Sequence, residues 1–573
     1  MSEADERQLD DEQQAAVRAE EHAIAVLAGP GSGKTRTLSH RARHLLRGQP
    51  RTKALLLTFT NKAAAEMKAR AVGVAAVTAD RLDAGTFHSF GMRLLRAHGT
   101  MIGLATDFEI LDDVEARQFA ERVASASGVS NAFGPWQHHR LRRTDPPERV
   151  ASFGASYQAA KLTEEVADFD DLVVYAADLL GEHLDLARAY GGRYAHLLVD
   201  EFQDTNAVQF DIVQALSPHA TTVSVFADDD QAIFRFVGAE TENIRRFVER
   251  LGATEYPLTC NYRSRQLIVD CGNNLIAADP RASGRRMRAH RDGGEVDLRR
   301  YASVDQEAEE IAGEIEVLVA EGTAASIAVL VRSGYRADEL VRALRRRHVP
   351  VTDWRGDTYE QVERRTMATI MCALRGRLNQ RRARRLCAFL GVEETDEDST
   401  HAFLSSLARD PVAEALLQLR QIAFDGASAL DLARQAQCVA NAQDPESGAR
   451  LAPVVDAVAD FERHDPQFSI DDFLAELALG SGGRSPTAGG GVRIATLHKT
   501  KGLQWPTVYL LGLEAGHMPD YRSDEDDLPD ERRACFVGVC RAEDCLILTF
   551  AQRFRTHRRH PSVFLAELGL AED

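Results

Sequence analysis

The sequence has few of the features that mark secreted or membrane-spanning proteins. Its 573 residues include eight cysteines and three tryptophans. So few cysteines in so long a chain argue against a disulfide framework. No apolar run approaches the roughly 20 residues that cross a bilayer. The first residues are acidic and polar, unlike a signal peptide. We therefore expect a cytoplasmic protein with several domains.

Positive charge is also scarce, because the formal net charge is −18. This balance argues against a surface that is basic throughout, although a local basic groove is still possible. Cys535, Cys540 and Cys545 are evenly spaced, which invites a metal-site interpretation. Their spacing fits none of the usual zinc pairings. The alternative, small buried side chains beside a helix and a strand, is favoured.

Against these absences stand two motifs. Residues 28–35 (AGPGSGKT) follow an apolar run and precede a helical pattern, which is the context of a phosphate-binding loop. Its glycines let backbone N–H groups approach phosphates at a helix N-terminus. Residues 199–204 (VDEFQD) place two carboxylates at the end of a second apolar run. Together the motifs predict binding and hydrolysis of a nucleoside triphosphate.

Specific roles follow from this chemistry. Lys34 is expected to reach the β- and γ-phosphates, and the Thr35 hydroxyl to ligate Mg²⁺. Asp200 is expected to hold the same ion. Glu201 is the candidate base that polarises the attacking water. A glycine turn that binds nothing is the alternative for residues 28–35.

Short apolar runs followed by helical patterns predict an α/β fold with parallel sheets. One set of runs indicates a first core and a later set indicates a second. The first set is 23–28, 54–59, 197–200 and 223–227, with a helix at 62–70; the second is 327–331, 492–495, 508–511 and 546–549.

Two stretches between these runs are predicted to be helical insertions without strands. We expect a first core from 1–95 and 166–258 with an insertion at 96–165. A second core is expected from 259–375 and 487–573 with an insertion at 376–486, which ends in a Gly/Ser-rich linker.

Further motifs occur in the order typical of one family. The chain resembles a superfamily 1 DNA helicase of the UvrD/Rep/PcrA type, as a compact member with two RecA-like motor domains. Besides the two motifs above, the matching segments are 9–13 (LDDEQ), 57–64 (LTFTNKAA), 85–89 (GTFHS), 168–172 (DFDDL), 227–236 (ADDDQAIFRF), 261–264 (NYRS), 496–503 (TLHKTKGL), 531–533 (ERR) and 537–542 (VGVCRA).

The resemblance implies further roles at the nucleotide. Gln231 would sense the γ-phosphate, Tyr262 would stack on adenine, and Arg263 and Arg541 would act as arginine fingers from the second core. Such planar, permanently charged donors suit a transferred phosphoryl group. The implied nucleotide-binding set is Gln13, Gly29, Gly31, Ser32, Gly33, Lys34, Thr35, Arg36, Tyr262 and Gln504.

It also implies a path for single-stranded DNA, which such proteins bind through aromatic platforms and backbone contacts. For each aromatic residue a place in the core is the alternative. The candidates are Thr58, Phe59, Thr60, Asn61, Lys62, Phe87, His88, Phe234, Phe236 and His498.

Three positions depart from the family pattern. Val237 stands where the family usually has Arg, which removes a DNA contact that the resemblance implies. Phe234 stands where Tyr is common. Gln504 stands in place of a Glu that binds the ribose, so we expect altered nucleotide affinity or selectivity.

The resemblance implies an ATP- and Mg²⁺-dependent motor that moves 3′→5′ on single strands and separates duplexes at ss/ds junctions, in repair or in replication and recombination. It would be nucleoid-associated, and a monomer or weak oligomer. Alternatives are a translocase that unwinds poorly alone, a DNA-stimulated ATPase subunit of a defence or repair complex with a partner nuclease, and a nucleotide-gated sensor. An RNA helicase is less favoured.

Overall fold

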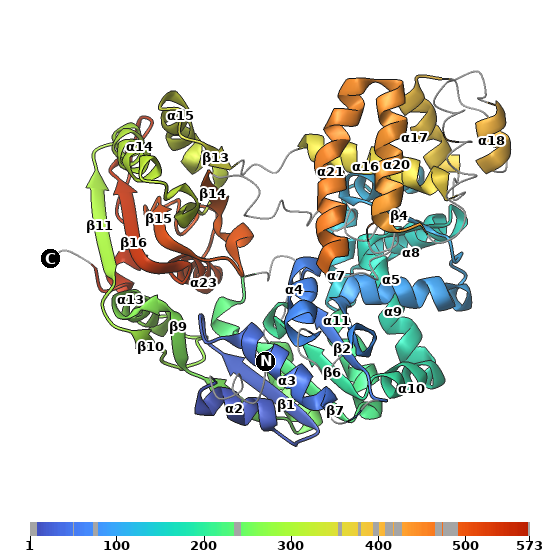
Figure 1. The fold of residues 1–573 in the computed structure, drawn as a ribbon, viewed down its shortest axis with the longest axis horizontal. Coiled ribbons are helices and arrows are strands. Elements are labelled where there is room, and N and C mark those ends of the chain that lie inside the picture. Colours follow the sequence, from blue (N-terminus) through green and yellow to red (C-terminus); the bar gives the residue numbers. More distant parts are fainter. Residues whose placement is uncertain are drawn as a thin grey trace.

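The computed structural model describes residues 9–47, 49, 51–72, 78–233, 242–352, 358–375, 380–392, 400–406, 416, 427–464, 473 and 491–570. It contains two six-stranded sheets, and all neighbouring strands in both are parallel. Figure 1 shows them side by side, with the N-terminal sheet at the lower right and the C-terminal sheet at the left. The predicted α/β class with two RecA-like parallel sheets is confirmed.

The first sheet has the strand order β3-β2-β6-β7-β1-β8. Its faces alternate along each strand, as a pleated sheet requires. Ile24 and Val26 pack towards α2, α3 and α4, whereas Ala23 and Ala25 pack on the opposite side against α5, α9 and α11. The strands are β1 (Ala23–Ala28), β2 (Ala54–Thr58), β3 (Leu82–Thr86), β6 (His196–Val199), β7 (Thr222–Ala227) and β8 (Thr254–Leu258).

We call this sheet with its covering helices the first sheet unit. Its two buried faces explain why the interior strands are continuous apolar runs. The helices are α2 (Asp11–Arg18), α3 (Lys34–Leu46), α4 (Asn61–Val72), α5 (Phe87–His98), α9 (Phe169–Glu182), α10 (Leu184–Arg193), α11 (Ala207–Leu216) and α12 (Glu242–Leu251).

The second sheet has the order β11-β16-β15-β12-β14-β13. Its strands are β11 (Glu295–Tyr301), β12 (Ile327–Val331), β13 (Val351–Thr352), β14 (Val492–Thr496), β15 (Trp505–Leu511) and β16 (Ala542–Ala551). A separate parallel pair, β9 (Cys260–Arg265) and β10 (Arg288–Arg291), lies where the chain enters this half. A short antiparallel pair, β17 (Arg553–Phe554) and β18 (His557–Arg558), follows β16.

One face of the second sheet packs against α13 and α23, and the other against α14 and α15. These helices, the sheet, the β9–β10 pair and α24 form the second sheet unit. The helix bounds are α13 (Gln266–Ala277), α14 (Val304–Ala320), α15 (Asp338–Arg346), α23 (Leu528–Val539) and α24 (Val563–Glu567).

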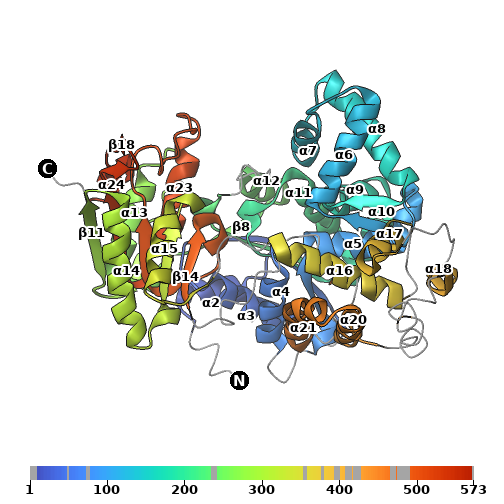
Figure 2. The same cartoon turned by 90° about the horizontal axis from the view of Figure 1, so that it is seen from above.

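Each unit is interrupted by a helical insertion. The first contains α6 (Asp113–Ser127), α7 (Phe133–Leu141) and α8 (Glu148–Thr163). The second contains α16 (Thr358–Leu374), α17 (Gln380–Leu390), α18 (Thr400–Ser406), α20 (Ala429–Gln443) and α21 (Pro445–His464). Although the second insertion interrupts the second unit, it lies beside the first half in both views, and its α21 contacts α4 (Figures 1 and 2).

The expectation that residues 96–165 contain no strand is wrong. β4 (Glu109–Leu111) pairs in parallel with β5 (Val166–Asp168), so a two-stranded ribbon ties the start of the first insertion to its end. The paired residues are over 50 positions apart in the sequence, so local sequence patterns could not predict this strand pair.

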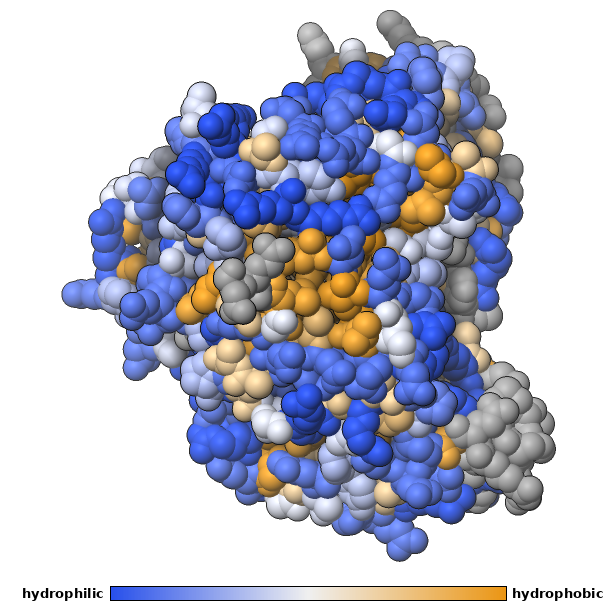
Figure 3. Space-filling view, turned by 90° about the vertical axis from the view of Figure 1, so that its left-hand side faces the viewer, coloured by the Kyte–Doolittle hydropathy of each residue, from blue (hydrophilic) through white to orange (hydrophobic). Residues whose placement is uncertain are grey.

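The surface of the second unit combines polar and apolar regions. Figure 3 views the molecule from that side, where apolar residues gather in the middle of a face that is otherwise largely hydrophilic. Among the described residues, none of the helices is long and apolar enough to cross a membrane.

Candidate functional site

The phosphate-binding loop connects β1 to α3 at the carboxyl edge of the first sheet. Gly31 and Gly33 have φ of +69° and +77°, which favour glycine. A Cβ on Gly31 would lie 2.4 Å from Asn261 Oδ1, and one on Gly33 would lie 2.8 Å from Gln13 Nε2. Ser32 Oγ donates to the Gly29 carbonyl at 2.7 Å. The loop therefore presents bare backbone at the N-terminus of α3, the arrangement that binds phosphate.

The adenine-side candidates meet this loop. Gln13 Nε2 donates to the Ser32 carbonyl at 2.8 Å. From the second unit, the Tyr262 N–H donates to the Gly31 carbonyl at 2.9 Å, and the Tyr262 hydroxyl donates to Asp10 Oδ2 at 2.5 Å. Segments more than 200 residues apart thus converge on the loop that precedes α3.

Lys34 is held by the two carboxylates at the end of β6. Its Nζ lies 2.7 Å from Glu201 Oε2 and 3.7 Å from Asp200 Oδ1. Burial raises the pKa of Asp200 to about 6, against the attraction of Lys34. Burial also disfavours the Glu201 charge, but Lys34 and Lys501 outweigh it and hold the pKa of Glu201 well below its usual range. Glu201 is therefore ionised and Asp200 is the more readily protonated member.

Glu201 is also fixed by its backbone and by neighbours. Its φ of +51° lies in the left-handed region, a conformation that costs free energy in a residue other than glycine. Gln203 Nε2 donates to Glu201 Oε2 at 2.5 Å, and Lys501 Nζ lies 3.6 Å from the same oxygen. Lys501 also pairs with Asp204 and donates to the Gln231 carbonyl at 3.1 Å. It joins the second unit to both acidic motifs of the first.

A polar chain runs from Glu201 to the second unit. Gln203 Oε1 accepts from the Asp228 N–H at 2.9 Å, and Asp228 Oδ2 accepts from Gln231 Nε2 at 2.6 Å. Gln231 Oε1 accepts from Arg541 Nη2 at 2.7 Å. Arg541 is 1% exposed. The predicted γ-phosphate sensor is thus held directly by a predicted arginine finger.

Arg263 lies beside Arg541. Its Nε donates to Gln504 Oε1 at 2.7 Å and its Nη1 donates to the Cys540 carbonyl at 3.0 Å. Its Cβ would be 2.8 Å from a Cβ on Gly31, so it faces the phosphate-binding loop. Burial, with repulsion by Arg263, lowers the pKa of Arg541 to about 9. Two guanidinium groups close together, one buried and one partly buried, indicate a site built for an anion.

Two loop-proximal candidates, Thr35 and Arg36, are partly buried in the first turn of α3. Thr35 therefore shares that turn with Lys34. Asp200 Oδ1 is buried and accepts no hydrogen bond. The predicted Mg²⁺ ligands are thus oxygen donors, one of them a buried carboxylate oxygen, which is the donor type this ion prefers.

The DNA-side candidates fall into different environments. Phe59 is 40% exposed at the end of β2, next to Asn61 at the start of α4, whereas Thr58 is buried. Thr60 Oγ1 accepts from the Ala63 N–H at 3.1 Å, which caps α4. Phe234, Phe236 and the side chain of Lys62 lie outside the described residues, as does Val237.

Phe87 is 3% exposed and packs in the core of the first sheet unit, so its ring has no free face for a base. His88 is half-buried and stacks on Phe169, with ring centroids 3.7 Å apart. Burial lowers the pKa of His88 to about 3 and that of His498 to about 4, so both rings are neutral at pH 7.

Four residues at the site were given no role in the sequence prediction. Gln203, Lys501 and Phe169 stand inside quoted motifs, but their partners come from other motifs. Asn261 Oδ1 accepts from the N–H groups of Arg263 and Ser264 at 2.8 and 2.9 Å, which shapes the turn that carries Arg263. The motifs marked these positions, whereas their contacts could not be read from the sequence.

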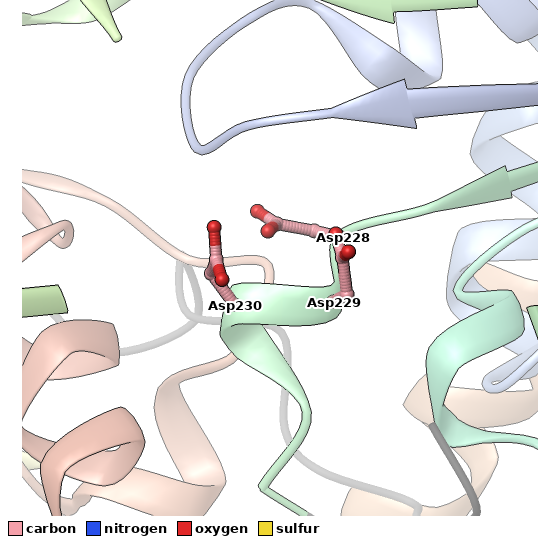
Figure 4. Close-up of side chains that lie close together, drawn as sticks. All are labelled: Asp228, Asp229 and Asp230. Atoms are coloured by element: carbon pink, nitrogen blue, oxygen red, sulfur yellow. The ribbon is translucent and has the colours of Figure 1, made fainter. Parts of the chain in front are cut away.

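Of the three evenly spaced cysteines, Cys535 and Cys540 are buried at α23, as the favoured interpretation predicts, and Cys545 on β16 is partly buried. In the described part of the chain, the residues close enough to share a metal ion are Asp228, Asp229 and Asp230 (Figure 4).

The fold and this site define a two-unit P-loop protein in which arginines from one unit reach the nucleotide site of the other. Residues 9–251 match the UvrD/REP helicase N-terminal domain, and residues 256–394 and 411–553 match the UvrD-like helicase C-terminal domain. The chain belongs to the UvrD/REP helicase family and is a helicase enzyme.

Several curated relatives align over almost the whole chain. DNA helicase II of Salmonella typhimurium and that of Escherichia coli are each 30% identical, over 98% of this chain and 87% of their own length. ATP-dependent DNA helicase PcrA of Leuconostoc citreum is 30% identical, over 98% of this chain and 85% of its own.

Proposed function

We propose that this helicase is an ATP-dependent DNA motor that moves 3′→5′ on single strands and separates duplexes. The observation that carries the proposal is the contact of Arg541 with Gln231 at 2.7 Å, within the same polar chain as Glu201. It crosses the junction between the two sheet units at the phosphate-binding loop, which we call the cleft. The names of the aligned relatives, DNA helicase II and ATP-dependent DNA helicase PcrA, support ATP as the nucleotide that is hydrolysed and DNA as the nucleic acid on which the protein moves. The direction rests on the family resemblance.

In the proposed reaction each group has one task. Lys34 leaves the carboxylates to bind the β- and γ-phosphates, which releases Glu201 to take a proton from the attacking water. Arg263 and Arg541 neutralise the charge that spreads over the transferred phosphoryl oxygens. Gln13, Tyr262 and Gln504 hold the base and ribose, and the 28–35 loop and Arg36 hold the phosphates.

The oxygen donors of Thr35 and Asp200 fit a Mg²⁺ ion, which would neutralise charge between the phosphates. The buried Asp200 oxygen without a hydrogen-bond partner supports this choice.

Coupling to movement follows from where the arginines reside. Because both belong to the second sheet unit and the water-activating Glu201 to the first, hydrolysis requires a closed cleft. A finger of this kind contributes about 10³–10⁵ in rate. Each turnover would therefore close and open the cleft, which moves DNA held on both units. We propose that the domains divide at the boundaries predicted from the sequence, with the end of the first insertion extended to include β5.

For the DNA path we propose Phe59, the stacked pair His88 and Phe169, and His498, with Phe234 and Phe236 as further platforms. Thr60, Asn61 and Lys62 would contact phosphates near Phe59, and Thr58 is left out because it is buried. Phe87 is left out because its ring is buried. Acting on chromosomal DNA places the protein at the nucleoid, and we propose a role in repair or in replication and recombination.

The test is strand separation on duplexes with a 3′ tail, a 5′ tail or no tail, with ATPase followed in the same samples. We expect unwinding from the 3′ tail alone and no turnover by Lys34→Ala, the matched inactive control. Unwinding from the 5′ tail would reverse the direction. DNA-stimulated ATPase without unwinding would favour a translocase or a subunit that works beside a partner nuclease.

A further inference from the structure

A loop of the second sheet unit crosses the nucleotide cleft beside the two arginines. This crossing segment, residues 279–287, connects α13 to β10. At its start Asp279 Oδ2 accepts from Arg533 Nε of α23 at 2.9 Å. At its end the Asn273 side chain pairs with the N–H and the carbonyl of Met287, both at 2.9 Å. The segment is therefore fixed to the second unit at both ends.

From residue 283 to residue 287, alternate residues of this segment contact the first unit. Ser283 donates to Asp230 through its N–H at 2.9 Å and its hydroxyl at 2.6 Å. Arg285 pairs with Asp229. Met287 packs on the phosphate-binding loop, where a Cβ on Gly29 would lie 2.0 Å from its Sδ. The segment thus touches two nucleotide-site loops at once.

The intervening residue, Arg286, faces away. Its side chain is 70% exposed and its Nη2 lies 3.8 Å from Asp270 of α13, on its own unit. Of the two adjacent arginines, Arg285 therefore reaches the first unit and Arg286 stays on its own unit.

The target of Arg285 is an acidic turn at the end of β7. Oxygens of Asp228, Asp229 and Asp230 all lie within 4.8 Å of one another (Figure 4). Burial, with repulsion by Asp230, raises the pKa of Asp228 to about 7. Burial disfavours the Arg285 charge, but Asp229 and Asp228 outweigh it and hold the pKa of Arg285 above its usual value. Close like charges need a counter-charge to stay ionised together.

The acidic turn in turn orients the γ-phosphate sensor. Asp228 Oδ2 accepts from the amide nitrogen of Gln231, while the amide oxygen of Gln231 accepts from Arg541. The Gln231 amide is held at both ends, and one end depends on where Asp228 lies.

We propose that Arg285 is a positioning residue for ATP hydrolysis: reaching across the cleft, it neutralises the 228–230 turn and thereby fixes the Asp228 carboxylate that orients Gln231. This inference rests on the proposed function. The Arg285 side chain pairs with Asp229, so it acts on Gln231 through the acidic turn and Asp228. When the cleft opens, the turn loses its counter-charge and Gln231 loses its fixed orientation.

The experiment compares steady-state ATPase of the full chain with saturating single-stranded DNA for the parent, Arg285→Ala, Arg285→Lys and Arg286→Ala. We expect Arg285→Ala to lower kcat about tenfold to a hundredfold, with the KM for ATP changed less than about threefold. Arg285→Lys keeps the charge and should restore most of kcat. Arg286→Ala should match the parent.

A double-mutant cycle separates positioning from folding. In an Asp229→Asn background the partner charge is already gone, so Arg285→Ala should cost several-fold less than in the parent. Thermal melting and binding of a fluorescent ATP analogue verify that each variant is folded. The inference is overturned if Arg285→Ala keeps kcat within about twofold, if its effect is wholly on KM, or if Asp229→Asn leaves its cost unchanged. A parent without DNA-stimulated ATPase would instead overturn the proposed function.

Discussion

The two carboxylates after β6 compete with nucleotide for the same lysine. Lys34 Nζ lies 2.7 Å from Glu201 Oε2 and forms an ion pair with that carboxylate when no phosphate is present. Lys501, 3.6 Å from the same oxygen, can keep Glu201 ionised after Lys34 moves to phosphates. Glu201 thus has two lysine partners: nucleotide draws Lys34 away, whereas Lys501 stays while the cleft is closed.

Replacing Glu201 with Gln should separate binding from turnover. The amide keeps the size of the side chain but cannot take a proton, so we expect DNA-stimulated kcat to fall about 10²–10⁴-fold. ATP affinity should hold or rise, because Lys34 no longer has a competing charge. Steady-state ATPase and titration with a fluorescent ATP analogue measure both effects. Glu249→Gln on the exposed face of α12 is the matched control, and turnover within fivefold of the parent would remove Glu201 from the role of base.

At this scale the sequence identified positions but not partners. Lys34, Glu201, Gln231 and Arg541 stand in recognisable motifs, so their presence at one site was predictable. That Lys501 reaches Asp204, 297 residues away, was not, because pairing over such a separation depends on how the two units close. Phe87 shows the opposite case, since its motif suggested a DNA platform and its ring fills the core.

At the scale of elements, continuous apolar runs predicted the interior strands of both sheets but not the edge strands. β1, β6 and β7 are covered on both faces and flanked on both sides, so apolar side chains line them throughout. The missed strands β3, β8, β11 and β13 are the sheet edges. β8 contains Pro257, which a sheet tolerates at its edge because that N–H needs no partner, and β11 alternates charged with apolar residues.

The turn into α3 offers a prediction at this scale. Gly33 has φ of +77° and a Cβ there would meet Gln13 Nε2 at 2.8 Å, so Gly33→Ala strains the backbone by about 1–2 kcal/mol and displaces the Gln13 side chain. We expect weaker nucleotide binding together with a small loss of stability.

Gly181→Ala near the end of α9 is the control, because nothing lies within 4 Å of its added Cβ. It should leave nucleotide binding unchanged and raise stability by up to about 1 kcal/mol. Nucleotide titration and thermal melting of both variants check this. Equal affinities in the two variants would contradict the assigned role of the loop.

At the scale of the molecule, the second insertion is joined to one unit and rests on the other. Its α17 contributes Arg385, whose Nη1 lies 2.8 Å from Glu109 of β4 and which also pairs with Glu115 of α6. Arg365 of α16 pairs with Asp112, and α21 packs on α4. No periodicity within either insertion predicts this, because the contact joins charges on two separately folded helical layers.

Arg385 should therefore couple the two insertions. Glu109 is 2% exposed and lies 3.9 Å from Arg382 as well, and removing the nearer cation from a buried carboxylate destabilises the folded state. We expect Arg385→Ala to speed hydrogen exchange of backbone amides in α6 and α17 several-fold, with a smaller effect for Glu115→Gln, because glutamine still caps the first turn of α6.

The control is Arg450→Ala. Arg450 makes its 3.4 Å ion pair with Glu446 inside α21, so its loss changes the charge of the insertion without touching the other layer. Exchange in α6 should then stay at the parent rate, because an exposed pair of this kind contributes little. Since α6 belongs to the first insertion and Arg385 to the second, faster exchange there can arise only through the contact between them. Equal acceleration by Arg385→Ala and Arg450→Ala would mean that the two layers are not held together by these charges.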